Sequence, residues 1–162
     1  MLSVVSATVF ADRLEVLVHV DGPLRTSAYP GLAERALAAV PSLAGHTCDN
    51  PDSASMAEEL ADTELPHLAE HLALDLMRRA GVRGRLRGDT SWDFGRDGAG
   101  TFRVQLYRAD DALALGALKW AVAAVNALAA GEQVADPQAE ATALREGRRR
   151  SRPEPRPRPR RR

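Results

Sequence analysis

The stretch at residues 64–79 constrains the fold most, because it predicts one amphipathic helix that must be buried along one side. Its leucines recur at spacings of three and four residues and form an apolar stripe: Leu65, Leu68, Leu72 and Leu76. Pro66 is tolerated in the first turn, where its missing N–H would be unpaired in any case. Gly81 follows the last turn as a stop signal. The rest of the chain must therefore supply a surface on which this helix can pack.

Three polar side chains share one face of the same expected helix. His67, Glu70 and His71 stand at positions i, i+3 and i+4. Two imidazoles one turn apart can bind one Zn²⁺, and a carboxylate between them can accept a proton from metal-bound water. This H-x-x-E-H pattern is the inverted zincin motif. The alternative interpretation is that both histidines are core or boundary residues of the helix whose hydrogen bonds are satisfied within the protein.

Hydrophobic periodicity predicts the remaining elements. Alternation of apolar and polar residues indicates strands, of which the first two are expected to form a hairpin. The expected strands are residues 2–10, 13–20 and 101–107, and the further expected helices are residues 30–40 and 110–130. We therefore expect an α+β fold in which a small antiparallel or mixed sheet is covered on one face by two main helices.

Two other groups of residues could bind ligands. The His46-x-Cys48 pair could ligate a soft metal, although a loop histidine beside a buried cysteine is the simpler interpretation. A local basic cluster could meet an acidic ligand or could be a solvated face. Its members are Arg83, Arg85, Arg87 and Arg96.

The C-terminal part of the chain differs in composition from the rest. Residues 145–162 hold ten of the 22 basic residues but only two of the 22 acidic ones. The chain after the long Ala/Leu helix, residues 132–162, is increasingly rich in Arg and Pro and lacks an apolar period. We therefore expect it to form a disordered basic tail after a domain at residues 1–131. The tail contains no aromatic residues for base stacking, and we expect it to bind nucleic acid only non-specifically.

Cysteine usage and hydropathy suggest a compartment. Cys48 is the only cysteine, which excludes an internal disulfide and fits a reducing environment. The first residues lack the basic segment and the cleavage site of a signal peptide. We also expect no apolar run to approach the ~20 residues needed to span a bilayer. We therefore expect a cytoplasmic protein that does not enter the membrane.

The order of these signals resembles the N-terminal domain of cyanophycin synthetase. That family has a strand pair followed by a run close to P-G-L-x-E-R-L-L-x-x-L-P-x-L-x-x-H-x-C, and this chain reads PGLAERALAAVPSLAGHTC at residues 30–48. The family continues with L-x-x-G-T-x-L-G-H-x-x-E-H-x-A-L-E-L, and this chain reads LADTELPHLAEHLALDL at residues 60–76. The resemblance covers roughly residues 1–131.

The resemblance also shows departures from the family pattern. Pro66 and Asp62 stand where the family has glycines, and Asp75 stands where it has a glutamate. The chain has no Gly-rich ATP loop and lacks the ATP-grasp and Mur-ligase-like domains of the synthetase. We therefore expect the activity of the N-terminal domain without polymer synthesis.

The resemblance implies two classes of function. The first is a zinc-dependent amide or peptide hydrolase that acts on an Asp–Arg-type polymer, with His67 and His71 as metal ligands and Glu70 as the general base. Inverted zincins take a third ligand from a separate helix, so Asp111 is the first choice and Asp110 the second, while His46 or Cys48 could replace them.

The second class is a non-catalytic accessory domain that binds such a polymer or peptide, with structural histidines. A separate synthetase-type protein is a further expected partner, and the long Ala/Leu helix could supply a homodimer surface.

Overall fold

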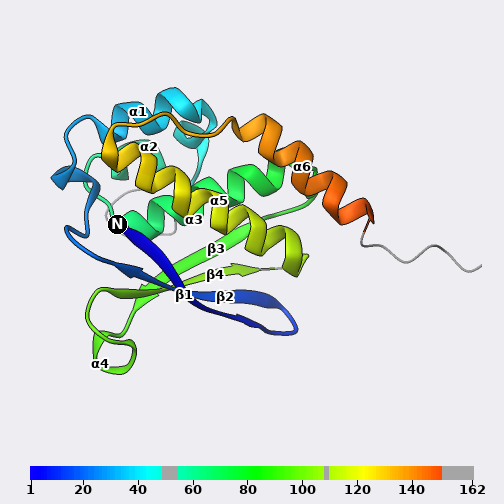
Figure 1. The fold of residues 1–162 in the computed structure, drawn as a ribbon, viewed down its shortest axis with the longest axis horizontal. Coiled ribbons are helices and arrows are strands. Elements are labelled where there is room, and N and C mark those ends of the chain that lie inside the picture. The colour runs from blue at the N-terminus through cyan, green and yellow to red at the C-terminus, as the bar shows by residue number, and fades with distance from the viewer. Residues whose placement is uncertain (49–54, 108–109, 151–162) are drawn as a thin grey trace, which may run out of the picture.

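The computed structural model describes residues 1–48, 55–107 and 110–150, with only the backbone of residue 149. The described part of the chain forms a four-stranded sheet whose helices gather on one face, except the short α4 (Phe94–Asp97) in the connection between the last two strands, so the expected α+β class is confirmed (Figure 1). The strands are β1 (Leu2–Val9), β2 (Arg13–Val20), β3 (Arg87–Trp92) and β4 (Thr101–Tyr107). The α-helices are α1 (Leu32–Ala39), α2 (Met56–Glu59), α3 (Leu65–Arg79), α4 (Phe94–Asp97), α5 (Asp111–Ala130) and α6 (Pro137–Arg150), with short 3₁₀ turns at Thr26–Ala28 and Pro41–Gly45.

The sheet is antiparallel throughout, in the order β1-β2-β4-β3. Strand β2 alternates between buried and half-buried positions, as its sequence predicted. Its inward residues pair directly with those of β4, for example Val16 with Val104 and Val18 with Phe102. These side chains are at most 1 % exposed and form the floor on which the helices pack.

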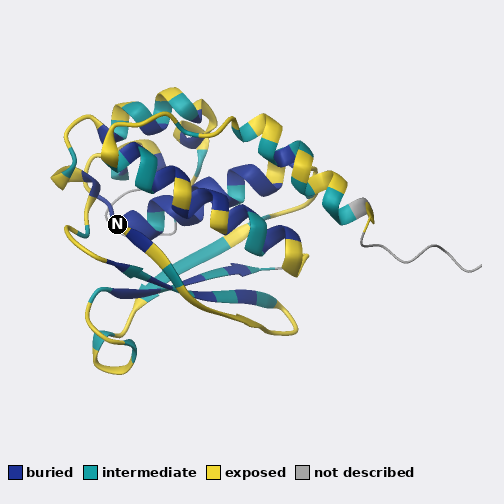
Figure 2. Ribbon diagram, viewed as in Figure 1, coloured by how far each residue is buried: buried dark blue, intermediate teal, exposed yellow. Residues whose placement is uncertain are grey.

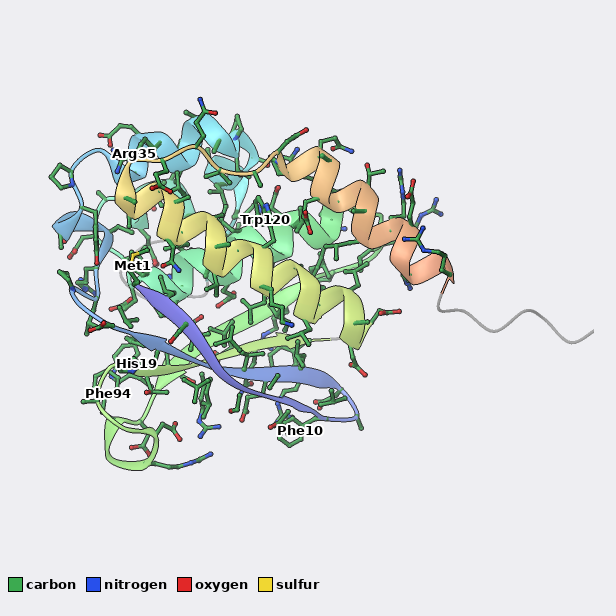
Figure 3. The ribbon with its side chains drawn as sticks, viewed as in Figure 1. Met1, Phe10, His19, Arg35, Phe94 and Trp120 are labelled. Carbon is green, nitrogen blue, oxygen red and sulfur yellow. The ribbon has the colours of Figure 1, made fainter. Side chains whose placement is uncertain are left out.

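Helices α3 and α5 lie between the sheet and the outer helices, where the buried residues are concentrated (Figures 1 and 2). The four leucines of the α3 stripe are all buried, which accounts for the central place of this helix. On α1, Arg35 donates hydrogen bonds from Nε and Nη2 to the Leu128 carbonyl oxygen, at 3.0 and 2.7 Å, and so ties α1 to the end of α5 (Figure 3).

Helix α5 corrects one expectation from hydropathy. It has 20 residues and is long and apolar enough to cross a membrane by length and composition, contrary to the expectation that the chain has no such run. In the fold this helix packs on α3, β1 and α6, and residues such as Ala117, Leu118 and Ala121 are fully buried. The apolar composition of α5 is thus explained by its position in the core.

The tail expected from residue 132 also needs correction, because residues 137–150 form α6. Asp136 begins this helix by accepting a hydrogen bond from the Gln138 N–H at 2.9 Å. Ala141 is buried, and Leu144 lies so close to α5 that a Cβ atom on Gly116 would be 2.5 Å from its Cδ2 atom. This short apolar face was too small to recognise as a helical period. The remainder of the expected tail, residues 151–162, lies outside the described residues.

Docking of α6 can be tested with two matched alanines. Ala141→Asp places a carboxylate in a site that is 1 % exposed, and it should lower the free energy of unfolding by about 1–3 kcal/mol. Ala143→Asp makes the same change at an exposed position of the same helix and should stay within about 0.5 kcal/mol of the parent. Urea denaturation measures both, and equal effects would show that α6 does not dock.

Candidate metal centre

The polar face of α3 meets the loop before α2 and the edge strand β3. His67, Glu70 and His71 project from α3, as the helical spacing predicted, and Cys48 approaches from the loop. The Sγ atom of Cys48 lies 3.5 Å from the Nε2 atom of His71, which lies 3.1 Å from the Nε2 atom of His67. All three ligand atoms are within 4.8 Å of one another. This Cys/His/His group could bind a metal ion.

The outer nitrogen of His67 faces hydrogen-bond acceptors. Its Nδ1 atom lies 2.8 Å from the Thr63 hydroxyl and 3.2 Å from a carboxylate oxygen of Glu59 on α2. These oxygens stabilise a proton on the Nδ1 atom of His67. The lone pair of its Nε2 atom is then directed at the Cys/His/His group. Carboxylate–histidine pairs of this kind orient metal ligands and increase their basicity.

His71 is oriented by a second chain of polar side chains. Its Nδ1 atom lies 3.1 Å from the Nδ1 atom of His46, whose Nε2 atom lies 3.6 Å from Asp75. Burial disfavours ionisation of Asp75, but hydrogen bonds from His46, Arg79 and Ser42 outweigh it and lower its pKa to about 2. The ionised Asp75 therefore favours a proton on the outer nitrogen of His46. That arrangement lets His71 donate from Nδ1 and keep a free lone pair on Nε2.

The protonation states of the three side chains differ. Burial lowers the pKa of His71 to about 3, with further lowering by His67 and His46, and burial also lowers the pKa of His67. Both imidazoles are therefore neutral near pH 7, as metal ligands must be. Burial, together with Glu59 and Glu70, raises the pKa of the Cys48 thiol to about 12. Cys48 must lose a proton before it can ligate a metal as a thiolate.

Glu70 is enclosed between α3 and β3. Its side chain is 4 % exposed, and its Oε2 atom accepts a hydrogen bond from the Thr90 hydroxyl at 2.7 Å. Gly88 permits this approach, because a Cβ atom there would lie 2.2 Å from the Glu70 Oε1 atom. Burial raises the pKa of Glu70 to about 7, with a smaller contribution from Asp89. A carboxylate that titrates near neutral pH suits a general base.

The third ligand predicted first from the sequence is not in this group. Asp111 is an exposed residue in the first turn of α5. Asp110 caps the same helix by accepting from the Leu113 N–H at 3.2 Å, and it also pairs with Arg148. The other two candidates from the sequence, Cys48 and His46, do lie beside the histidines. The Cys48 thiol is within metal-ligand reach of His67 and His71, and His46 contacts the opposite ring nitrogen of His71. Glu59 gave no signal in the sequence, because its role depends on how α2 abuts α3.

Open space reaches the centre from outside. Two neighbouring cavities, of about 210 and 180 Å³, share Thr47, His71, Leu74 and Leu86 in their walls. The smaller one also contains Glu70, Arg85 and Arg87. His71 and Glu70 therefore both border open space.

These features define an α+β domain with a Cys/His/His group that could hold a metal beside a buried carboxylate. The family model of the cyanophycin synthase-like N-terminal domain matches residues 13–130, and the chain belongs to this family. The match confirms the resemblance that was read from the sequence. A comparison with curated proteins finds no match.

Removal of Glu59 should weaken metal binding without removing a ligand. Glu59→Ala deletes the carboxylate beside the His67 Nδ1 atom, and the dissociation constant for zinc should rise roughly 10–100-fold. The control is Glu34→Ala, which removes a carboxylate at an exposed position of α1, outside the Cys/His/His group. Competition with a chelator measures both constants. Equal affinities in the two variants would mean that Glu59 does not position His67.

Proposed function

We propose that this chain is a zinc-dependent amide hydrolase that acts on an Asp–Arg-type polymer or peptide. The observation that carries the proposal is the convergence of Cys48, His67 and His71. Tetrahedral zinc with ordinary bond lengths separates two nitrogen ligands by about 3.3 Å and a sulfur and a nitrogen by about 3.6 Å. The corresponding separations here are 3.1 Å between the histidine nitrogens and 3.5 Å from Cys48 to His71.

In this proposal each side chain has a separate role. Cys48, His67 and His71 would hold the metal, which would supply Lewis acidity when bound. Glu70 accepts a proton from the attacking water and returns it to the leaving amine. Thr90 holds the Glu70 carboxylate against β3, and Glu59 and His46 fix the two imidazoles.

The proposal is tested by metal analysis and cleavage together. Purified protein should contain close to one zinc per chain. It should cleave an Asp–Arg polymer or a peptide of Asp and Arg, and a chelator should abolish the cleavage. Added zinc should restore it. Failure to cleave any such substrate with zinc bound would overturn the hydrolase assignment.

A second candidate function is a non-catalytic binding domain for the same polymer. The burial of Glu70 favours it, because a carboxylate that is 4 % exposed and bonded to Thr90 has limited access to a substrate. This alternative requires polymer binding without metal-dependent turnover, so the same cleavage assay separates the two functions.

A further inference from the structure

Two exposed arginines lie beside the candidate metal centre and have no part in the function proposed above. Arg85 lies in the segment that connects α3 to β3, Arg87 is the first residue of β3, and Leu86 between them is half-buried. Both arginines line the cavity of about 180 Å³ that also contains Glu70 and His71. Their side chains therefore place two positive charges in the wall of that cavity.

The same two arginines also line a second cavity. This space, of about 430 Å³, lies toward the end of the sheet, and its other wall residues are Asp12 and Tyr107. Arg85 and Arg87 thus stand between the metal centre and an outer cavity. A substrate longer than one residue could pass both arginines while one of its amide groups lies near Glu70.

The charges of this pair are available to a ligand. Within the described part of the chain, neither guanidinium forms an ion pair with a carboxylate, whereas Arg25, Arg79 and Arg103 each do. Arg87 lies over the ring of Tyr107, with 5.5 Å between the guanidinium carbon and the ring centroid. This contact orients the planar group and leaves its N–H edges free to meet a carboxylate.

From this arrangement we propose that Arg85 and Arg87 form a carboxylate-binding subsite that selects substrates with an acidic group next to the scissile amide. The inference rests on the proposed hydrolase function and specifies which part of the substrate is recognised. Guanidinium groups bind carboxylates through paired, charge-assisted hydrogen bonds. Asp89 in the inner cavity and Asp12 in the outer one flank the two arginines with negative charge. A substrate that alternates carboxylates and cations matches this order of charges.

Binding of two peptides tests the subsite without catalysis. The protein carries Glu70→Gln so that turnover is slow on the timescale of the measurement, and calorimetry measures its affinity for acetyl-Asp-Arg-Asp-Arg-amide and for the same peptide with Asn in place of Asp. The Asp peptide should bind at least about tenfold more tightly. Adding Arg85→Gln and Arg87→Gln should remove this preference.

The control changes two exposed arginines that line neither cavity, Arg83→Gln with Arg145→Gln. It removes the same charge and should keep the preference for the Asp peptide. Equal loss in both double variants would mean that only net charge matters and would overturn the subsite. Retention of the preference in the Arg85/Arg87 variant would overturn it as well.

Metal content and cleavage by the parent protein are measured in parallel. Absence of cleavage together with an Asp preference that depends on Arg85 and Arg87 would defeat the hydrolase function and support the subsite. Cleavage together with equal affinity for the two peptides would support the hydrolase and overturn the subsite.

Discussion

Replacement of Glu70 by glutamine should lower the turnover of an Asp–Arg substrate by roughly 10²–10⁴, the usual contribution of general acid–base catalysis. The amide keeps the size of the side chain and can still accept a hydrogen bond from Thr90, but it cannot take a proton from water. Zinc content should stay whole, because Glu70 is not among the three converging ligand atoms. Steady-state cleavage and metal analysis on the same preparation measure both quantities.

The pH dependence of turnover gives a second measure of the same role. Burial raises the pKa of Glu70 to about 7 in the metal-free protein, and the positive charge of a bound zinc would lower it. The base is lost as the carboxylate is protonated, so activity should fall as the pH decreases through a value at or below about 7.

The control for Glu70 is Glu34→Gln at an exposed position of α1, which should keep parental turnover. Parental turnover in Glu70→Gln itself would refute the role of Glu70 as the base.

The parts of the fold that follow a hydrophobic period could be predicted from the sequence. Strand β2 alternates cleanly because one of its faces is buried by helices and the other is not. Helix α3 carries enough leucines to mark a stripe, and α5 is mostly apolar because it packs against α3, β1 and α6. Helix α6 escaped prediction because Ala141 and Leu144 are its main apolar contacts and its other residues are mostly polar or basic.

The candidate site could be predicted only where its residues are neighbours in the sequence. His67, Glu70 and His71 are close together on one helix, and helical geometry alone places them on one face. Cys48 comes from a separate loop whose path depends on tertiary packing, so the sequence could offer it only as an alternative to Asp111. The same reason hides Glu59 and the contact between His46 and His71, since neither follows from any local period.

Above the pKa of Glu70, the affinity for zinc should rise about tenfold for each pH unit, by roughly 10² between pH 8 and pH 10, if Cys48 is the third ligand. Burial raises the pKa of its thiol to about 12, so the thiol is protonated throughout this range, and zinc binding must release that proton. The histidines and Glu70 add no slope in this range, because burial keeps both imidazoles neutral and Glu70, whose pKa is about 7, is already ionised. Chelator competition across this range measures the slope, and calorimetry in buffers of different ionisation enthalpy counts the released protons.

Two variants then identify the third ligand. Cys48→Ala should lose most of the affinity and all of the slope, whereas Asp111→Asn should behave like the parent, because Asp111 is exposed on α5 and absent from the converging group. A site completed by Asp111 in place of the thiol would have no thiol proton to release, so zinc binding would lack this rise in affinity between pH 8 and pH 10. A flat profile, with zinc kept by Cys48→Ala and lost by Asp111→Asn, would therefore assign the third ligand to Asp111. A tenfold rise in zinc affinity per pH unit that disappears in Cys48→Ala would assign the third ligand to Cys48.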